Sequence, residues 1–304
     1  MRSTNQTLTA IEGITVGHAT NATARTGCTV ILCPSGATAG VDVRGAAPGT
    51  RETEALRSGR LVQKAHAVLL TGGSAFGLDA AGGVVEYLEA QNVGFPAGPV
   101  RVPIVPAAVI FDLSVGDAEV RPDREMGYQA CLNATDAPVA MGAIGAGMGA
   151  TVGKAPGVTS SPGGVGSACV RLDSGLIVAA ITVVNALGNV VDPTTGEILA
   201  GGKENGNFVD ITERLLDANN IVRGTNTTIG VVATNATLTS AETNRVAEMA
   251  HDGMARAIRP AHTMFDGDTL FALATGSYTD GNVNTVGILA AEVVARAIVN
   301  AVAA

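Results

Sequence analysis

The sequence predicts a layered α/β fold, formed by one domain of 304 residues. Hydrophobic residues make up 46% of the chain and charged residues 15%, which is typical of a globular protein with a large interior. Residues 176–184 are apolar throughout, as in a strand that is covered on both faces. Residues 286–302 form a predicted helix that is apolar apart from one narrow stripe, Glu292, Arg296 and Asn300, so most of this helix is expected to be buried.

The first half of the chain is predicted to be rich in strands. Apolar and β-branched runs separated by Gly, Pro and Asn predict strands at residues 11–16, 28–33, 38–43, 67–71 and 103–113. The strand at 67–71 leads through Gly72-Gly73-Ser74-Ala75-Phe76-Gly77 into a helix predicted at 80–88. The G-x-G-x-x-G pattern of dinucleotide-binding folds is absent, so a tight turn for close packing is the favoured interpretation, with a ligand at the helix N-terminus as the alternative.

The second half alternates strands and helices. The predicted elements are a hairpin at 168–172 and 176–185, a short helix at 208–216 within a loop-rich connector, a strand from Thr227, a helix through Ala257, a strand at 270–275 and the closing helix. The helix that ends at Ala257 starts at Thr239-Ser240-Ala241-Glu242, which has the form of a capping box. No repeat or linker divides the chain, so we expect a single domain over residues 1–304.

Charge and composition exclude several classes of partner. The net charge is −8 and no Lys/Arg-rich run is present, which disfavours nucleic acid and acidic membranes. The polar stripe of the closing helix argues for a place in the core and against a membrane span. Residues 1–6 contain no apolar segment of a secretory signal, so we expect a cytoplasmic protein.

No metal or cofactor site is expected from the motifs. The four cysteines include no C-x-x-C pair and the four histidines have no zinc-binding spacing, so the cysteines are interpreted as small apolar residues. The glycine run at 141–153 fails the P-loop pattern, because Met148 and Ala155 stand where glycine and Ser or Thr are needed. What remains is a single lysine, Lys154, at the end of a flexible run.

A candidate nucleophile lies at the junction Asn226-Thr227. A polar loop, residues 223–226, enters the β-branched run Thr227-Thr228-Ile229-Gly230-Val231-Val232, which places a threonine hydroxyl at the start of a strand. If the bond before Thr227 breaks, this residue carries both a nucleophilic hydroxyl and a free α-amine that can act as its base. The same residues are also typical of a strand with a purely structural role.

Three motifs together give a resemblance to a known family. They are Leu70-Thr71-Gly72-Gly73-Ser74-Ala75-Phe76-Gly77-Leu78, Asn226-Thr227-Thr228-Ile229, and Arg259-Pro260-Ala261-His262-Thr263 continuing to Asp266-Gly267-Asp268-Thr269-Leu270-Phe271. The chain resembles, over nearly its whole length, the self-processing L-aminopeptidase/D-amidase-esterases, β-aminopeptidases and nylon-oligomer (6-aminohexanoate-oligomer) hydrolases. The Asn-Thr junction and Asp-Gly-Asp-Thr-Leu-Phe are closest to the nylon-oligomer branch.

The resemblance implies a four-layer αββα sandwich of the N-terminal-nucleophile (Ntn) hydrolase kind, similar to that of ornithine acetyltransferase. It also implies self-cleavage between Asn226 and Thr227, which leaves fragments 1–226 and 227–304 (304 − 226 = 78 residues) associated in a homotetramer. By position, Thr227 is the nucleophile, Lys154 and Asn185 line the site, and Asp266 and Asp268 orient Thr227.

Chemistry supports these roles. A mature α-amine has an unperturbed pKa of about 7.7–8.0, so it can accept the hydroxyl proton near neutral pH. Asn185 offers an N–H donor to the tetrahedral oxyanion. Lys154 adds positive charge there and can keep the α-amine neutral by like-charge repulsion. Asp266 and Asp268 can accept hydrogen bonds from the amine and the hydroxyl.

The expected activity is hydrolysis of amide bonds in small linear substrates, either N-terminal residues of peptides or amide oligomers, through an acyl-threonine intermediate. Phe111 stands where relatives carry a site tyrosine, which leaves substrate preference open. With Gly72, Gly73 and Ser74, it is a candidate for the substrate pocket. Two alternatives remain: an acyltransferase of the ornithine-acetyltransferase type, and a non-enzymatic, uncut binding protein on the same scaffold.

Overall fold

The computed structural model describes residues 5–217 and 226–304. The main strands are β1 (Thr15–Asn21), β2 (Thr26–Val43), β3 (Thr50–Arg51), β4 (Lys64–Thr71), β7 (Ala107–Val109), β10 (Gly164–Arg171), β11 (Ile177–Asn185), β16 (Thr227–Ala236) and β18 (Thr269–Tyr278). The α-helices are α1 (Ala80–Ala90), α2 (Arg124–Leu132), α3 (Ile211–Asp217), α4 (Ser240–Ala257) and α5 (Val283–Ala303). The polar residues 223–225 and the first four residues, on which predictions were made, lie outside the described residues.

Shorter elements complete the described chain. They are the strands β5 (Phe95–Ala97), β6 (Val100–Val102), β8 (Thr151–Val152), β9 (Ser161–Pro162), β12 (Asn189–Val191), β13 (Ile198–Ala200), β14 (Lys203–Glu204), β15 (Asn207–Phe208) and β17 (Ile258–Arg259), and the 3-10 helices η1 (Leu8–Ala10), η2 (Glu54–Leu56), η3 (Ser74–Asp79) and η4 (Gly145–Gly147).

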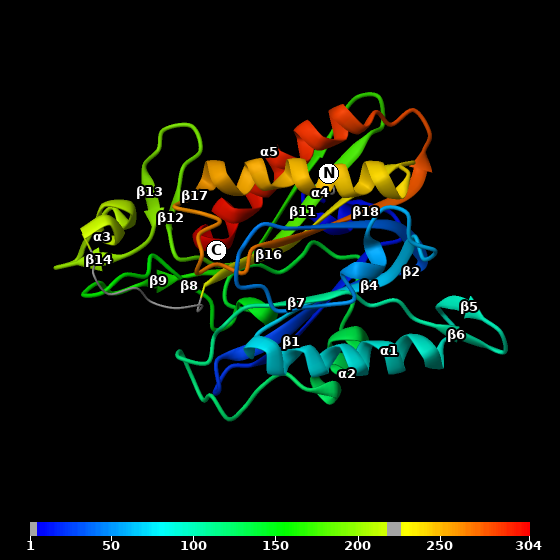
Figure 1. Ribbon diagram of the computed structural model, residues 1–304, viewed down its shortest axis with the longest axis horizontal. Coiled ribbons are helices and arrows are strands. Elements are labelled where there is room, and N and C mark those ends of the chain that lie inside the picture. The colour runs from blue at the N-terminus through cyan, green and yellow to red at the C-terminus, as the bar shows by residue number, and fades with distance from the viewer. Residues whose placement is uncertain (1–4, 218–225) are drawn as a thin grey trace.

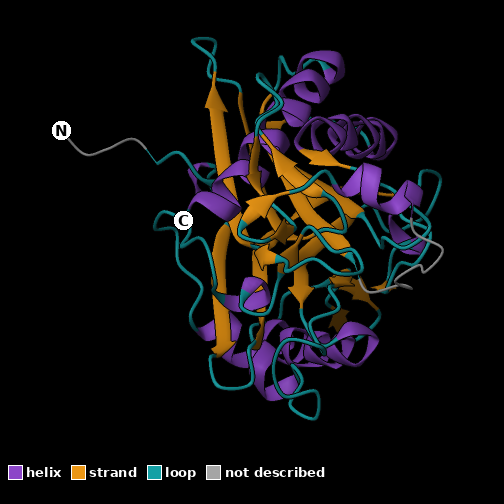
Figure 2. Ribbon diagram, turned by 90° about the vertical axis from the view of Figure 1, so that its left-hand side faces the viewer, coloured by secondary structure: helices purple, strands orange, loops and turns teal. Residues whose placement is uncertain are grey.

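The elements stack as helix, sheet, sheet and helix. Helices α4 and α5 cover one side of the strands, and α1 and α2 cover the other (Figure 1). Turned by 90°, the strands lie between these two groups of helices (Figure 2). One path of hydrogen bonds, β10-β11-β16-β18-β2-β4-β7-β3 with β1 beside β2, joins all the main strands. The predicted four-layer αββα sandwich is therefore confirmed.

Strand β2 connects the two sheet layers. Its second half, from Thr38 to Val43, pairs with β18, whereas its first half pairs with β1 and β4. The register with β4 shifts between Leu32 and Ala37, the position where the strand passes from one layer to the other. A bulge of this kind bends a strand and increases its twist.

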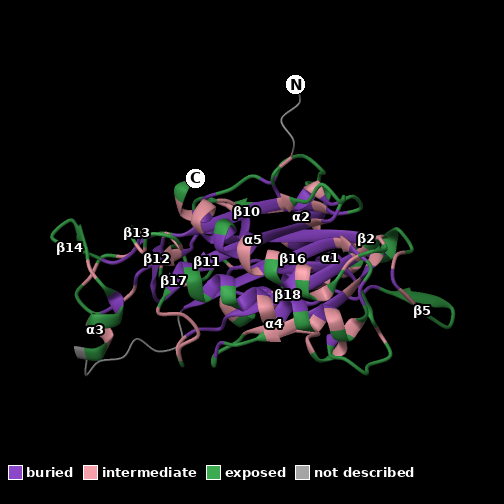
Figure 3. Ribbon diagram, turned by 90° about the horizontal axis from the view of Figure 1, so that it is seen from above, coloured by how far each residue is buried: buried purple, intermediate pink, exposed green. Residues whose placement is uncertain are grey.

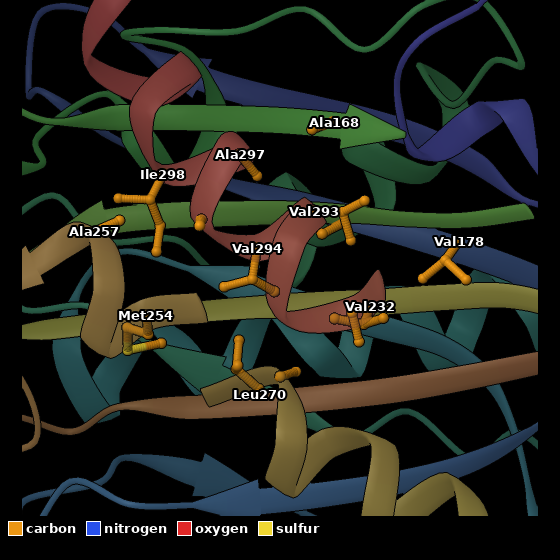
Figure 4. Close-up of a cluster of buried hydrophobic side chains, with 14 of the residues drawn as sticks. Ala168, Val178, Val232, Met254, Ala257, Leu270, Val293, Val294, Ala297 and Ile298 are labelled. Carbon is orange, nitrogen blue, oxygen red and sulfur yellow. The ribbon is translucent and has the colours of Figure 1, made fainter. Parts of the chain in front are cut away.

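Three hydrophobic cores separate the four layers. The first lies between α4, α5 and the strands β10, β11, β16 and β18, with Val232, Met254, Leu270 and Val294 among its residues (Figure 4). The second fills the space between the two layers of strands, and the third packs α1 and α2 against β2 and β4. Alternate residues of β11 enter different cores, as expected of a strand that is covered on both faces.

Helix α5 has the length and hydropathy that would also suit a membrane span, and within residues 5–217 and 226–304 it is the one such helix. It packs on β10, β11 and α4, and Val293, Val294 and Ile298 are fully buried. Seen from above, its exposed residues form only small patches (Figure 3). Burial against the sheet accounts for its apolar composition.

The four cysteines are free and buried, as predicted. Burial raises the pKa of the Cys33 thiol to about 12 and that of Cys131 to about 12, so both stay protonated at neutral pH. These residues behave as small apolar side chains in the second and third cores.

Several predicted elements differ from those observed. The first strand starts at Thr15 rather than residue 11, and the segments 28–33 and 38–43 belong to one strand. Only Ala107–Val109 of the predicted strand 103–113 is a strand. The next residue, Ile110, accepts the N–H of Ser74 in the glycine turn after β4. Helix α2 and the short strands β12 to β15 were not predicted.

Candidate active site

Thr227 is the first residue of β16, where the sequence places the start of a strand. Across the antiparallel pair β11–β16 it faces Asn185, the last residue of β11. Strand β18 flanks β16 on the other side, in parallel. Thr227 is 6% exposed and Asn226 only 1% exposed, so this junction is buried while the chain is uncut.

The carbonyl of Asn226 is held by hydrogen bonds. The main-chain N–H of Gly267 donates to its oxygen over 3.0 Å. The Thr227 hydroxyl also donates to this oxygen, so it lies directly beside the peptide bond that precedes it. Asn226 and Asp266 form an isolated parallel bridge, which fixes the loop before β18 against the start of β16.

Asn185 links Lys154 to the strand end opposite Thr227. The Lys154 ammonium donates to the side-chain oxygen of Asn185 over 2.8 Å and to its main-chain oxygen over 3.2 Å. The N–H of Thr151 donates to the same side-chain oxygen, and the Asn185 amide N–H donates to the carbonyl of Phe111. Asn185 is fully buried, so this side chain has one fixed orientation.

The position of Lys154 follows from close backbone packing. Its N–H donates to Leu187 over 2.8 Å, and Gly153 donates to Gly188 over 3.0 Å. Gly153 has a φ of +76°, and a Cβ there would lie 1.9 Å from the nitrogen of Gly202, so only glycine fits. Burial lowers the pKa of Lys154 to about 7, and the negative charge of Asp266 opposes this shift.

Asp266 is a buried carboxyl beside a second one. Its Oδ2 accepts hydrogen bonds from the N–H and the hydroxyl of Thr263. Burial, and then the like charge of Asp268, raise the pKa of Asp266 to about 6. A carboxyl group of this kind can exchange a proton close to neutral pH.

Asp268 holds the residue next to Thr227. Its Oδ1 accepts the N–H of Thr228 over 2.7 Å, and its Oδ2 accepts two hydrogen bonds from His262. Within the described ranges, neither Asp266 nor Asp268 makes a side-chain hydrogen bond to Thr227. The Asp268 carboxylate thus holds Thr228, the neighbour of Thr227, whereas the Asp266 carboxylate holds Thr263. Hydrogen bonds from the amine and hydroxyl of Thr227 to these carboxylates stay a prediction for a cut chain.

Comparison with known proteins identifies the family. The sequence profile of peptidase family S58 matches residues 6–304. The chain belongs to peptidase family S58. Membership places it among the hydrolases of amide or peptide bonds.

Its relatives in this family span nearly the full chain. An uncharacterised aminopeptidase of Mycobacterium leprae is 43% identical, over 100% of this chain and 92% of the relative. A 6-aminohexanoate-oligomer endohydrolase of Paenarthrobacter ureafaciens is 32% identical, over 99% of this chain and 88% of the relative.

Solved structures share the fold. The L-aminopeptidase D-Ala-esterase/amidase of Ochrobactrum anthropi, described as a variant of the Ntn-hydrolase fold, gives a TM-score of 0.74 at 20% identity and covers 99% of this chain and 86% of that chain. A β-aminopeptidase of Burkholderia gives a TM-score of 0.70 at 23% identity, over 98% of this chain and 86% of that chain. The Ntn-hydrolase fold of this S58 chain, as predicted, is therefore confirmed.

The predicted pocket residues Gly72, Gly73 and Ser74 are connected to Asn185 through the segment Phe111-Asp112. The N–H of Gly73 donates to the Asp112 carboxyl over 2.7 Å, and the N–H of Ser74 donates to Ile110. A Cβ on Gly72 would lie 2.1 Å from Oδ2 of Asp112. Because the carbonyl of Phe111 accepts the side-chain N–H of Asn185, these residues are connected to Asn185 through hydrogen bonds. A substrate role for them stays a prediction.

Sequence reasoning assigned no role to three groups near the site. They are the N–H of Gly267, the side chain of His262 and the buried carboxyl of Asp112. Burial raises the pKa of Asp112, while hydrogen bonds from Thr26 and Gly73 oppose the shift. His262 and Gly267 stand inside the motifs quoted for the family resemblance, which was the only available signal.

The arrangement provides the parts for acyl transfer from an amide. It brings together a hydroxyl beside a carbonyl, an N–H on the carbonyl oxygen, and a lysine and a carboxyl that titrate near neutral pH. No three His, Cys, Asp or Glu side chains of the described ranges converge as metal ligands.

Proposed function

We propose that the protein is a self-processing N-terminal-threonine amidohydrolase with Thr227 as its nucleophile. The observation that carries this proposal is the contact of the Thr227 hydroxyl with the Asn226 carbonyl, whose oxygen also accepts the N–H of Gly267. An N–H at this position can stabilise the negative charge that develops on the oxygen during attack.

Self-cleavage proceeds in two steps. In the first, Oγ1 of Thr227 bonds to the carbonyl carbon of Asn226 and the C–N bond breaks, so that the hydroxyl proton ends on the released α-amine. In the second, water hydrolyses the ester, which restores the hydroxyl and leaves a carboxylate on Asn226. Before the cut no α-amine exists. Lys154, which bonds Asn185 opposite Thr227 and has a pKa of about 7, is the proposed base that accepts the proton.

The mature site repeats this chemistry on a substrate. The α-amine of Thr227 replaces Lys154 as the base, and the substrate acyl group is held as an ester on Oγ1 until water releases it. Asn185, opposite Thr227, and Lys154 supply donors and positive charge to the oxyanion. Asp268 fixes the N–H of Thr228 and therefore the start of the strand.

The proposed substrates are small linear amides, either the N-terminal residues of peptides or amide oligomers. The names of the relatives, an aminopeptidase and a 6-aminohexanoate-oligomer endohydrolase, support both classes. Association of the two fragments in a homotetramer stays a prediction of the family resemblance, and a cytoplasmic location stays a prediction from the sequence of residues 1–6.

Intact mass under denaturing conditions tests the proposal. The wild type should give two masses that meet at Asn226 and Thr227, and the isosteric variant Thr227→Val a single uncut chain without amidase activity. Thr228→Val is the matched control, because this neighbouring hydroxyl is buried without a hydrogen-bond partner in the described part of the chain. A cut and active Thr227→Val protein would falsify the assignment of the nucleophile.

A further inference from the structure

Asp268 is positioned from one side by a single residue. Its Oδ2 accepts the main-chain N–H of His262 over 3.1 Å and the ring Nδ1 of the same residue over 2.8 Å. A carboxylate only accepts hydrogen bonds, so Nδ1 carries the proton in this pair. The other oxygen, Oδ1, accepts the N–H of Thr228. His262, Asp268 and the residue after the nucleophile thus form one chain of hydrogen bonds.

The backbone of His262 has a conformation that residues other than glycine rarely adopt. Its φ is +57°, in the left-handed region. This conformation directs the main-chain N–H and the ring of one residue to the same carboxylate oxygen. Left-handed non-glycine residues persist where the surrounding structure imposes them, and they cluster at functional sites.

The ring of His251 packs against the ring of His262 and fixes its position. The two rings meet edge to face with centroids 4.9 Å apart, and the His251 side chain is fully buried. Nε2 of His251 is 3.1 Å from the main-chain oxygen of Asp42, so the ring is anchored to β2. Burial lowers the pKa of His251 to about 4, and this ring therefore packs against His262 in its neutral form.

The second ring nitrogen of His262 argues against a purely structural role. Nε2 is buried and has no hydrogen-bond partner in the described part of the chain. A buried polar atom without a partner is costly, and an apolar ring would fill the same space without that cost. The hydrogen bond from Nδ1 to Asp268 is what a histidine adds here.

We propose that His262 is a positioning residue of the active site, which holds Asp268 so that the carboxylate in turn fixes Thr228 and the attacking hydroxyl of Thr227. This inference rests on the proposed function, since Thr227 is the nucleophile there. His262 acts through Asp268 and, in the described part of the chain, forms no hydrogen bond with Thr227 or Asn226.

Three substitutions that tolerate a positive φ provide the test. His262→Asn keeps a side-chain N–H for Asp268, His262→Gly removes it, and His262→Asp replaces it with a second carboxylate. We expect kcat and the rate of self-cleavage to fall about 10–100-fold in the Gly and Asp variants, the range for a hydrogen bond to a charged group, with KM within about twofold. The Asn variant should stay within about threefold of wild type.

Hydrogen exchange at the Thr228 amide is measured in the same proteins. The exchange rate reports how firmly Asp268 holds the N–H of Thr228, whether or not the protein is active. Thermal unfolding shows that each variant is folded. Faster exchange of the Thr228 amide in the Gly and Asp variants, with a rate close to wild type in the Asn variant, supports the role of His262. Equal exchange and equal kcat in all three overturn it, while a wild type that stays uncut and inactive contradicts the proposed function instead.

Discussion

The N–H of Gly267 donates a 3.0 Å hydrogen bond to the carbonyl oxygen of Asn226, the oxygen of the peptide bond in front of Thr227. Gly267 stands between the two carboxyl residues Asp266 and Asp268, so the loop that carries both acids also carries a donor for the Asn226 carbonyl. Donor and carboxylates are therefore positioned by the same turn. A substitution at Gly267 is therefore expected to disturb both the donor and the two carboxylates.

Gly267→Ala keeps the main-chain N–H but should displace it from the Asn226 oxygen, and self-cleavage should slow at least about tenfold, since complete loss of one oxyanion donor costs about 100–1,000-fold. The added Cβ would lie 2.7 Å from the oxygen of Ala47 and 2.9 Å from Oγ1 of Thr227, so both must shift. Intact mass over time after refolding measures the rate. Gly82→Ala, in helix α1 with only the flexible Arg124 side chain nearby, is the control that should cut at the wild-type rate.

Lys154 should give the self-cleavage rate its pH dependence. The rate should rise as pH increases through about 7, because Lys154 loses its proton there. Both Lys154→Met and Lys154→Arg should lose this rise and cut about 100-fold more slowly, since neither supplies a base at these pH values. An Arg variant that cuts at the wild-type rate would show that positive charge alone is sufficient.

Asp266→Asn should stabilise the uncut protein at neutral pH. The pKa of Asp266 is raised to about 6 in the folded chain, so the folded state binds more protons than the unfolded state between about pH 4 and 6 and loses stability as pH rises through that window. In a Thr227→Val background, urea unfolding at pH 7 should show a gain of about 1–2 kcal/mol for the Asn variant. At pH 4 the two proteins should be nearly equal.

Asn185→Asp should change the titration of Lys154. The new carboxylate keeps the acceptor for Lys154 and raises the pKa of the lysine, so the pH at which self-cleavage accelerates should move up by roughly one unit. Asn235→Asp is the control, at an asparagine near the far end of β16 from Thr227, where the side-chain oxygen accepts the N–H of Ile177 and the side-chain N–H donates to Gly175. It should cost stability without moving the pH profile.

The sequence predicted the parts of the site that depend on local patterns. The start of β16 at Thr227 and the capping box of α4 follow from neighbouring residues, and Asn185 ends its strand where the apolar run ends. The five site residues come from four separate parts of the chain, and the structure brings them together around one strand end. Their roles in catalysis stay predictions.

Elements that depend on tertiary pairing were missed. Pro34 and Gly36 predict a turn, yet they lie inside β2, because its two halves pair with different strands on either side of a register shift. Helix α2 has an N-cap signal, Asp123, whose side chain accepts the N–H of Met126, but its mixed sequence lacks an apolar stripe. The bond from Gly267 to Asn226 joins distant segments and has no local signature.

Strand β16 lies between β11 and β18, and β18 pairs in turn with β2. A cut before Thr227 would therefore yield two polypeptides within one sheet, with β16 and β18 of the second piece inserted between β11 and β2 of the first, so neither piece has a complete hydrophobic interior alone. Scission would convert a first-order folding reaction into a second-order one. The melting temperature of the processed protein should then rise with protein concentration, whereas that of the uncut variant stays constant, and once denatured the two pieces would have to find each other again.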